Sequence, residues 1–172
     1  MPVQKKTILI CYDDHRSFTE DIRKRFSDSS RYNVVSFHTR QDFIACCKTE
    51  SDNRECKIAI IGVPDTREQF QAIEDLTLEI KRIDQKTGLI LLAQGDKMDD
   101  LKKIIKFNID SYIIRNTNMI LRLHNAVKKI ISEHSIVLYK KRRNFALYVL
   151  SGFLFLSLAA FLVACLLFPE CF

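Results

Sequence analysis

The sequence predicts an α/β fold, a doubly wound five-stranded parallel sheet of (βα)5 type, followed by one C-terminal transmembrane helix. Three observations predict it. Short apolar runs alternate with segments in which apolar residues recur every three or four positions, as in amphipathic helices. The 172 residues suffice for one ordinary domain and a short appendage. A long uncharged apolar run stands near the end of the chain. Strands that alternate with helices in this way form a parallel sheet covered on both faces.

The strands are predicted from five short runs. They are residues 7–12 (TILICY), 32–37 (YNVVSF), 57–62 (KIAIIG), 89–93 (LILLA) and 112–114 (YII). Most of these runs do not alternate with polar residues, which is typical of strands buried on both faces. In an open parallel sheet, ligands bind beside the carboxyl ends of the strands, so we expect functional residues there.

Amphipathic helices are predicted between and after these strands. Their apolar stripes are Phe18, Ile22 and Phe26; Phe43, Ile44 and Cys47; Phe70, Ile73, Leu76, Ile80 and Ile83; Leu101, Ile104 and Ile105, in a helix over 98–107; and Ile120, Leu123, Val127 and Ile130. Spacings of three and four put each stripe on one face of its helix, where it covers the sheet. We expect the last of these helices to end near residue 135.

Residues 145–168 predict the transmembrane helix. The run FALYVLSGFLFLSLAAFLVACLLF has 24 residues and no charge, and 15 of them are Leu, Val or Phe. At about 1.5 Å per residue it would be roughly 36 Å long, enough to cross a hydrocarbon core of about 30 Å. The alternative, a buried helix of a soluble core, would normally keep a polar stripe, and this run offers only Tyr148, Ser151 and Ser157. We therefore expect the lipid bilayer as a partner.

The cations before this run predict its orientation. Four stand in succession: Lys140, Lys141, Arg142 and Arg143. By the positive-inside rule, the N-terminal part lies in the cytoplasm. We thus expect a domain over 1–135, a basic juxtamembrane linker over 136–144, the single-pass span, and a short extracytoplasmic tail over 169–172. The first residues, MPVQKKTILICYDD, hold too short an apolar stretch for a signal peptide, so the chain is predicted to be tail-anchored.

The net charge of +6 does not predict nucleic-acid binding. Residues 1–139 hold 23 Lys and Arg against 20 Asp and Glu, a net of +3. The rest of the surplus is the juxtamembrane cluster, which suits a topology signal and an attraction to anionic lipid headgroups. Nucleic acid is therefore not an expected partner.

The six cysteines predict neither a metal site nor a disulfide framework. No CxxC pair occurs, and no histidine stands at metal-ligand spacing from a cysteine. In a reducing cytoplasm these thiols serve as small apolar residues. They are Cys11, Cys46, Cys47, Cys56, Cys165 and Cys171. The histidines are widely separated and are interpreted as surface residues: His15, His38, His124 and His134.

Four features together resemble the receiver domain of bacterial two-component response regulators. They are the order of elements, the acid pair Asp13-Asp14 after the first strand, the Val63-Pro64 dipeptide after the third, and Tyr112 ahead of a cation on the fifth. The resemblance covers roughly residues 5–134. It implies a CheY-like fold and a role in phosphorelay signal transduction. With the predicted anchor, it implies a place at the bacterial inner membrane.

The chain departs from this family at the residues that carry its chemistry. In the family the acid pair holds Mg²⁺, an Asp at the end of the third strand takes a phosphoryl group, a Ser or Thr ends the fourth strand, and a Lys ends the fifth. Matched by position, these last three are Gly62, Ala93 and Arg115. Glycine offers no nucleophile for phosphoryl transfer. Mg²⁺ at Asp13 and Asp14 would lose one of three anionic neighbours and bind weakly. The resemblance is thus to a degenerate receiver, a pseudo-receiver.

These departures suggest a role for Arg115. Two adjacent carboxylates at a strand end repel one another unless a cation is near. A guanidinium from a neighbouring strand end could take the place of Mg²⁺ beside Asp13 and Asp14 and hold the domain in one conformation. The alternative is that both acids are solvated remnants of ancestry. Asp65 could be a substitute acceptor, but it follows a proline in a predicted turn, where Asp commonly bonds to its own backbone.

We weigh three functions. The first is a phosphorylation-independent binding module that docks another signalling or membrane protein. The second is a response regulator with an atypical acceptor. The third, an enzyme on a doubly wound fold, lacks support because no GxGxxG, P-loop or nucleophile-elbow motif occurs. We therefore expect no enzymatic activity, and no cofactor beyond weakly held Mg²⁺.

The resemblance also implies where a partner would dock. In the family, protein contacts are made by the face around the fourth helix, the fifth strand and the fifth helix. The matching residues here are Lys102, Lys103, Lys106, Tyr112, Arg115 and Asn118. A homodimer is compatible with the sequence, although the predicted anchor shows no clear small-xxx-small seam.

Overall fold

A computed structural model of the chain describes residues 6–13, 16–49, 56–64, 66, 69–105 and 108–167, with their side chains except those of 16–18, 49, 138, 141, 142 and 159–167. The chain divides into two units, Met1–Ser132 and Glu133–Phe172. The first unit contains the sheet and all the residues of the candidate site.

Five parallel strands form the sheet of the first unit. They are β1 (Thr7–Tyr12), β2 (Tyr32–Phe37), β3 (Cys56–Gly62), β4 (Gly88–Ala93) and β5 (Ser111–Ile114). Their order across the sheet is β2-β1-β3-β4-β5. The register places Leu9 of β1 between Val34 and Ile58. The predicted five-stranded parallel sheet is confirmed, and every strand begins and ends within one residue of its predicted bounds.

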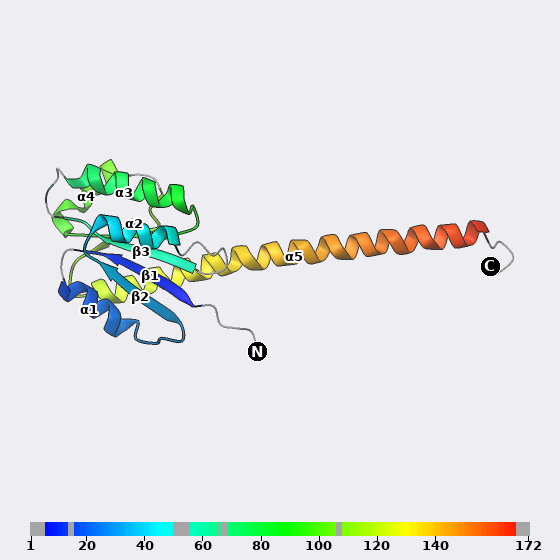
Figure 1. The fold of residues 1–172 in the computed structure, drawn as a ribbon, viewed down its shortest axis with the longest axis horizontal. Coiled ribbons are helices and arrows are strands. Elements are labelled where there is room, and N and C mark those ends of the chain that lie inside the picture. Colours follow the sequence, from blue (N-terminus) through cyan, green and yellow to red (C-terminus); the bar gives the residue numbers. More distant parts are fainter. Residues whose placement is uncertain are drawn as a thin grey trace. The chain divides into compact units, whose positions relative to one another are not determined.

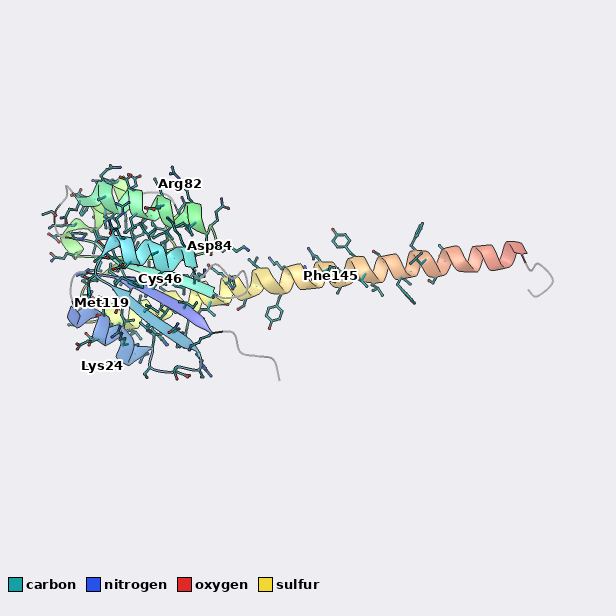
Figure 2. The ribbon with its side chains drawn as sticks, in the orientation of Figure 1. Lys24, Cys46, Arg82, Asp84, Met119 and Phe145 are labelled. Atoms are coloured by element: carbon teal, nitrogen blue, oxygen red, sulfur yellow. The ribbon has the colours of Figure 1, made fainter. Side chains whose placement is uncertain are left out.

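Helices cover both faces of this sheet (Figure 1). One face carries α2 (Arg40–Thr49), α3 (Phe70–Ile83) and α4 (Met98–Ile104). The other carries α1 (Arg16–Arg25) and the start of α5 (Met119–Leu167). Charged side chains such as Lys24 on α1 and Arg82 on α3 point away from the sheet (Figure 2). The fourth helix begins at Met98 as predicted, directly after a 3-10 turn, η2 (Gly95–Lys97), but it ends at Ile104 and not at residue 107.

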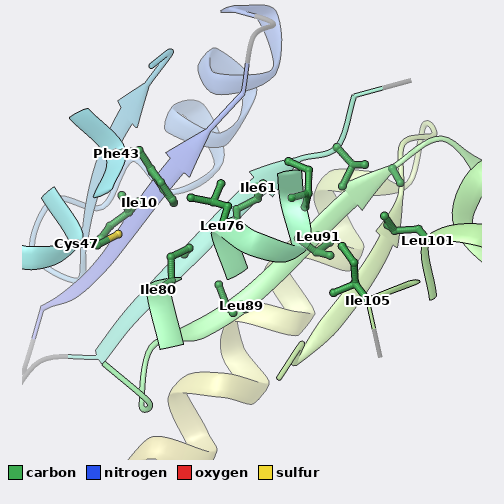
Figure 3. Close-up of a cluster of buried hydrophobic side chains, with 14 of the residues drawn as sticks. Ile10, Phe43, Cys47, Ile61, Leu76, Ile80, Leu89, Leu91, Leu101 and Ile105 are labelled. Atoms are coloured by element: carbon green, nitrogen blue, oxygen red, sulfur yellow. The ribbon is translucent and has the colours of Figure 1, made fainter. Parts of the chain in front are cut away.

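The core consists of two apolar clusters, one on each face of the sheet. The cluster under α2, α3 and α4 is shown in Figure 3. Its fully buried members include Ile10, Phe43, Ile61 and Leu91. The cluster under α1 and α5 includes Leu123 and other residues of the predicted stripes. Burying each such large side chain stabilises the fold by roughly 1.5–3 kcal/mol.

Side-chain caps begin two of the helices. At the start of α2, the backbone N–H of Asp42 donates to Oγ1 of Thr39 at 3.2 Å, and the Thr39 hydroxyl donates to Oδ2 of Asp42 at 2.6 Å. Ahead of α5, the N–H of Asn118 donates to Oδ1 of Asn116 at 3.1 Å. Such caps satisfy backbone donors that have no partner within the helix.

The described part of the second unit is helical and belongs to α5. Residues 136–144, which we predicted to be a linker, are helical within α5. Large apolar side chains of this unit, such as Phe145, Phe153 and Phe155, are exposed. Among the residues that the structure describes, no helix combines the length and the apolar character that crossing a bilayer requires. The predicted span over 145–168 reaches beyond the described side chains, which end at residue 158, and residues 168–172 lie outside the described part.

Candidate functional site

Four of the predicted site residues lie at one edge of the sheet. Asp13 directly follows β1, and Arg115 directly follows β5. Gly62 and Ala93 are the last residues of β3 and β4. Because all the strands are parallel, their carboxyl ends meet at the same edge. Asp14, the other member of the predicted acid pair, lies outside the described residues.

Strand alternation puts three of these four residues on the same face. Asp13, Gly62 and Arg115 each follow, by two positions, a member of the cluster under α1 and α5: Cys11, Ile60 and Ile113. Ala93 belongs to the cluster on the opposite face and is buried there. Its methyl group is therefore part of the core under α2, α3 and α4. The structure brings Asp13, Gly62 and Arg115 together and places Ala93 behind them.

Arg115 and Asp13 form an ion pair. Nη2 of Arg115 donates to Oδ2 of Asp13 at 2.7 Å. The Asp13 side chain is 2% exposed and the Arg115 side chain 22%. The pair joins the ends of β1 and β5, which are separated in the sheet by β3 and β4. A charge-assisted hydrogen bond of this kind is stronger than a neutral one, and removing either residue would deprive the other of this interaction.

Backbone hydrogen bonds fix the positions of Asp13 and Arg115, and a histidine contacts Asp13 as well. The N–H of Asp13 donates to the Phe37 carbonyl at 3.4 Å, and the N–H of Arg115 donates to the Ala93 carbonyl at 2.8 Å. Nδ1 of His38 donates to the Asp13 carbonyl at 2.9 Å. His38 is exposed, as predicted, but the sequence analysis did not predict this contact. The only signal for it was the position of His38 directly after β2.

Gly62 leaves room for the ion pair. A Cβ atom built on Gly62 would lie 2.5 Å from Cγ of Asp13 and would also overlap Oδ2 of Asp13 and Nη2 of Arg115. Real Cβ atoms essentially never come closer than 3.0 Å to a heavy atom outside their own residue and its two chain neighbours. The space that a side chain at position 62 would need is therefore filled by the two charged groups.

The described residues supply few ligands for a Mg²⁺ ion. Within the part of the chain that the structure describes, no group of three or more His, Cys, Asp or Glu residues could hold a metal. Mg²⁺ prefers several oxygen ligands in octahedral geometry. At this edge Asp13 is paired with a cation of the protein itself, and Gly62 brings no carboxylate.

The predicted partner face is described in part. Lys102 and Lys103 of α4 are exposed, and Nζ of Lys103 lies 3.8 Å from Oδ1 of Asp100. Asn118 is exposed just before α5. Tyr112 of β5 is half-buried, and its hydroxyl donates to the Ile105 carbonyl at the end of α4. Burial raises the pKa of the Tyr112 hydroxyl. Lys106 lies outside the described residues.

The predicted topology signal lies within α5. Lys140 and Arg143 are exposed on this helix. The side chains of Lys141 and Arg142 lie outside the described part, although their backbone is helical.

Comparison with known proteins rests on structure alone. No family model matches the chain, and no curated protein sequence matches it. Solved structures, in contrast, do match the fold of this chain. A response regulator receiver domain from Clostridium thermocellum superposes with a TM-score of 0.59 at 18% identity, covering 76% of this chain and 98% of that one. The chain has the receiver fold.

Two further neighbours show how widely this receiver fold is used. The adenylate cyclase from Rhodopirellula baltica aligns with a TM-score of 0.61 at 13% identity, over 80% of this chain and 96% of that one. A structure from a family of streptococcal redox sensors, described as evolved from two-component response regulators, has a TM-score of 0.61 at 11% identity. It covers 76% of this chain and 53% of that one. At such identities the likeness establishes the fold, and function has to be argued from the site.

Proposed function

We propose that this chain is a membrane-tethered pseudo-receiver that binds a signalling or membrane protein without phosphoryl transfer. Gly62 carries the proposal. It brings no carboxylate to the end of β3, and the space beyond it is filled by the Asp13–Arg115 pair. Phosphoryl transfer to a receiver needs a carboxylate nucleophile at that place. The receiver fold supports a signalling role, and the loss of the acceptor supports binding rather than phosphotransfer as its basis.

The docking surface that we propose is the face formed by α4, β5 and the start of α5. Lys102 and Lys103 of α4 are exposed on this face, and Arg122 adds a further exposed cation from α5. Such a surface suits an acidic protein partner, because opposite charges steer association and select the partner. Tethering would raise the effective concentration of the domain near a partner in the same membrane without any new contact.

The exposed apolar residues of α5 support the tether. Four successive residues, 153–156, are Phe, Leu, Phe and Leu, and their exposed fractions run from 59% to 73%. Successive residues of an α-helix point in directions about 100° apart, so four of them cover every side of the helix. A protein partner would cover one stripe and leave the others in water. The hydrocarbon core of a bilayer would contact all sides of the helix. The cations Lys140 and Arg143 precede this apolar segment, where a cytoplasmic headgroup region would begin.

Phosphate incorporation tests the proposal. The full chain in mild detergent is incubated with radiolabelled acetyl phosphate and Mg²⁺, beside a receiver domain that has the acceptor Asp. We expect label on the control receiver and none on this chain. An alkali-labile phosphate on this chain would reveal an acyl phosphate, overturn the proposal, and favour the alternative of a response regulator with an atypical acceptor.

A further inference from the structure

The candidate site holds a cation that belongs to the protein. In the receiver pattern this edge is arranged around a metal ion, and among the described residues no group of three or more His, Cys, Asp or Glu could hold one. Instead, Nη2 of Arg115 contacts Oδ2 of Asp13 at 2.7 Å. The Asp13 carboxylate is nearly fully buried, and burying a charge costs solvation energy that a nearby opposite charge offsets. Arg115 supplies that charge.

Glycine at position 62 is required for space and not for backbone conformation. Among the described residues no glycine has a positive φ, so an L-residue would meet no conformational penalty at Gly62. What an L-residue would meet is the ion pair, since its Cβ would lie 2.5 Å from Cγ of Asp13. A side chain at position 62 therefore requires the Asp13 and Arg115 side chains to shift from the arrangement seen here.

We propose that Gly62, Arg115 and Asp13 form one coupled device, a guanidinium lock, in which the Arg115 side chain takes the place of both the metal ion and the third-strand side chain. The lock ties the end of β1 to the end of β5 and holds this edge of the sheet in one arrangement without any ligand. This inference rests on the proposed function and deepens it, because it states what replaces phosphorylation at the same site.

The chemistry of the guanidinium makes the lock permanent. An arginine side chain keeps its proton at any physiological pH, and it offers several N–H donors in a fixed planar fork. The lock therefore needs no metal ion to supply its positive charge. A lysine at the same position would carry a flexible point charge that can leave the carboxylate more easily.

A double-mutant cycle between positions 62 and 115 tests the lock in the full chain. The variants are Gly62→Ala, Arg115→Ala and the two combined, and urea unfolding in mild detergent measures their folding equilibrium constants. If the side chain at 62 is excluded by the ion pair, Gly62→Ala lowers the constant by about tenfold or more in the native background. In the Arg115→Ala background, where Asp13 is no longer tied to Nη2 of Arg115, we expect the same change to lower it by about threefold or less.

Gly95→Ala is the matched control. Gly95 stands at the same edge of the sheet, and a Cβ there would meet Cγ2 of Ile114 at 3.3 Å without touching the ion pair. Its effect should be the same with and without Arg115. Additive effects of Gly62→Ala and Arg115→Ala, like those expected for the control, would overturn the lock.

A second readout guards against variants that fold poorly. The double variant Gly62→Asp with Arg115→Lys restores a carboxylate on β3 and removes the guanidinium. We expect millimolar Mg²⁺ to raise the melting temperature of this variant and to leave that of the native chain unchanged. A rise in the native chain would show that a metal can displace Arg115 and would overturn the lock. Phosphate incorporation by the native chain tests the proposed function separately, so the two can fail independently.

Discussion

Single buried residues of the first unit bear on a redox role. Cys11 lies at the end of β1 and Cys56 at the start of β3, and both are buried. Burial raises the pKa of the Cys11 thiol to about 12 and that of Cys56 to about 11. The thiolate is the reactive form of cysteine, so these two thiols are inert at neutral pH. A streptococcal redox sensor shares the fold of this chain, but Cys11 and Cys56 are not suited to such chemistry.

These thiols predict how stability depends on alkaline pH. Their folded-state pKa values are raised above the ordinary value of 9.0. Their contribution is therefore complete below pH 9 and is lost as the pH rises towards the folded-state values, because only the unfolded chain ionises in that window. From pH 8 to pH 10, each thiol should lower the free energy of unfolding by about 1.4 kcal/mol.

Urea unfolding at both pH values, followed by near-UV circular dichroism, measures this loss. The comparison is with the variant carrying Cys11→Ala and Cys56→Ala, in which tyrosine and lysine still titrate. The native chain should lose more stability than this variant. Equal losses would show that the two thiols are not protected from ionisation.

At the scale of elements, α4 and β5 are joined by one side chain. The Tyr112 hydroxyl of β5 donates to the carbonyl of Ile105, the residue that follows α4. The backbone N–H of Ile105 in turn donates to the Leu101 carbonyl at 2.8 Å. Helix α4 is only seven residues long, and so short a helix depends on tertiary contacts for its order. Tyr112 thus positions the helix that carries Lys102 and Lys103 of the proposed docking surface.

Replacing Tyr112 by Phe should loosen α4. The change removes one hydrogen bond and leaves the Ile105 carbonyl without this donor, at a cost of about 1 kcal/mol in the free energy of unfolding. Hydrogen exchange measured by mass spectrometry should show faster exchange in α4 and unchanged exchange in β1 and β3.

Tyr32→Phe is the control for this change. The Tyr32 ring packs edge-on against Phe26, with centroids 5.0 Å apart. Its hydroxyl makes no hydrogen bond within the described part of the chain, so its removal should leave α4 unaffected. Exchange in α4 that is equally fast in both variants would contradict a positioning role for Tyr112.

At the scale of the whole molecule, the chain consists of two units with different surfaces. The first, Met1–Ser132, buries its apolar residues in two clusters. The described part of the second, Glu133–Phe172, exposes nearly all of its large apolar side chains. Exposed apolar surface on this scale marks an interaction site. We propose a lipid bilayer as the partner of this surface.

Two arginines in the predicted span should release the chain from membranes. Each arginine near the centre of a span opposes insertion by about 2.5–3.5 kcal/mol. We expect the native chain to stay in the membrane pellet after alkaline carbonate extraction, and the variant with Leu154→Arg and Leu158→Arg to appear in the supernatant. Leu121→Arg, the same change at an exposed leucine of the first unit, should not release it. Extraction of the native chain by carbonate would contradict the tether.

Much of the fold could be predicted from local sequence. The strands are apolar runs with sharp ends, so their bounds were predicted to within one residue. The end of the fourth helix was misjudged because Ile105 continues the apolar stripe, although it lies beyond the last helical residue, Ile104. The last helix of the domain was expected to end near residue 135, but Lys and Arg are good helix formers and α5 continues through residues 136–144.

The sequence by itself determined the parallel sheet, the position of the site at its carboxyl edge, and the absence of a reactive carboxylate at Gly62. Periodicity and residue identity are local properties of the sequence, so these features can be predicted without knowing which distant residues are in contact. Only the tertiary structure decided that Arg115 reaches Asp13, 102 residues away, and that the two fill the space beside Gly62. Which charges meet across a sheet depends on strand order and side-chain direction, and these are settled when the whole core packs.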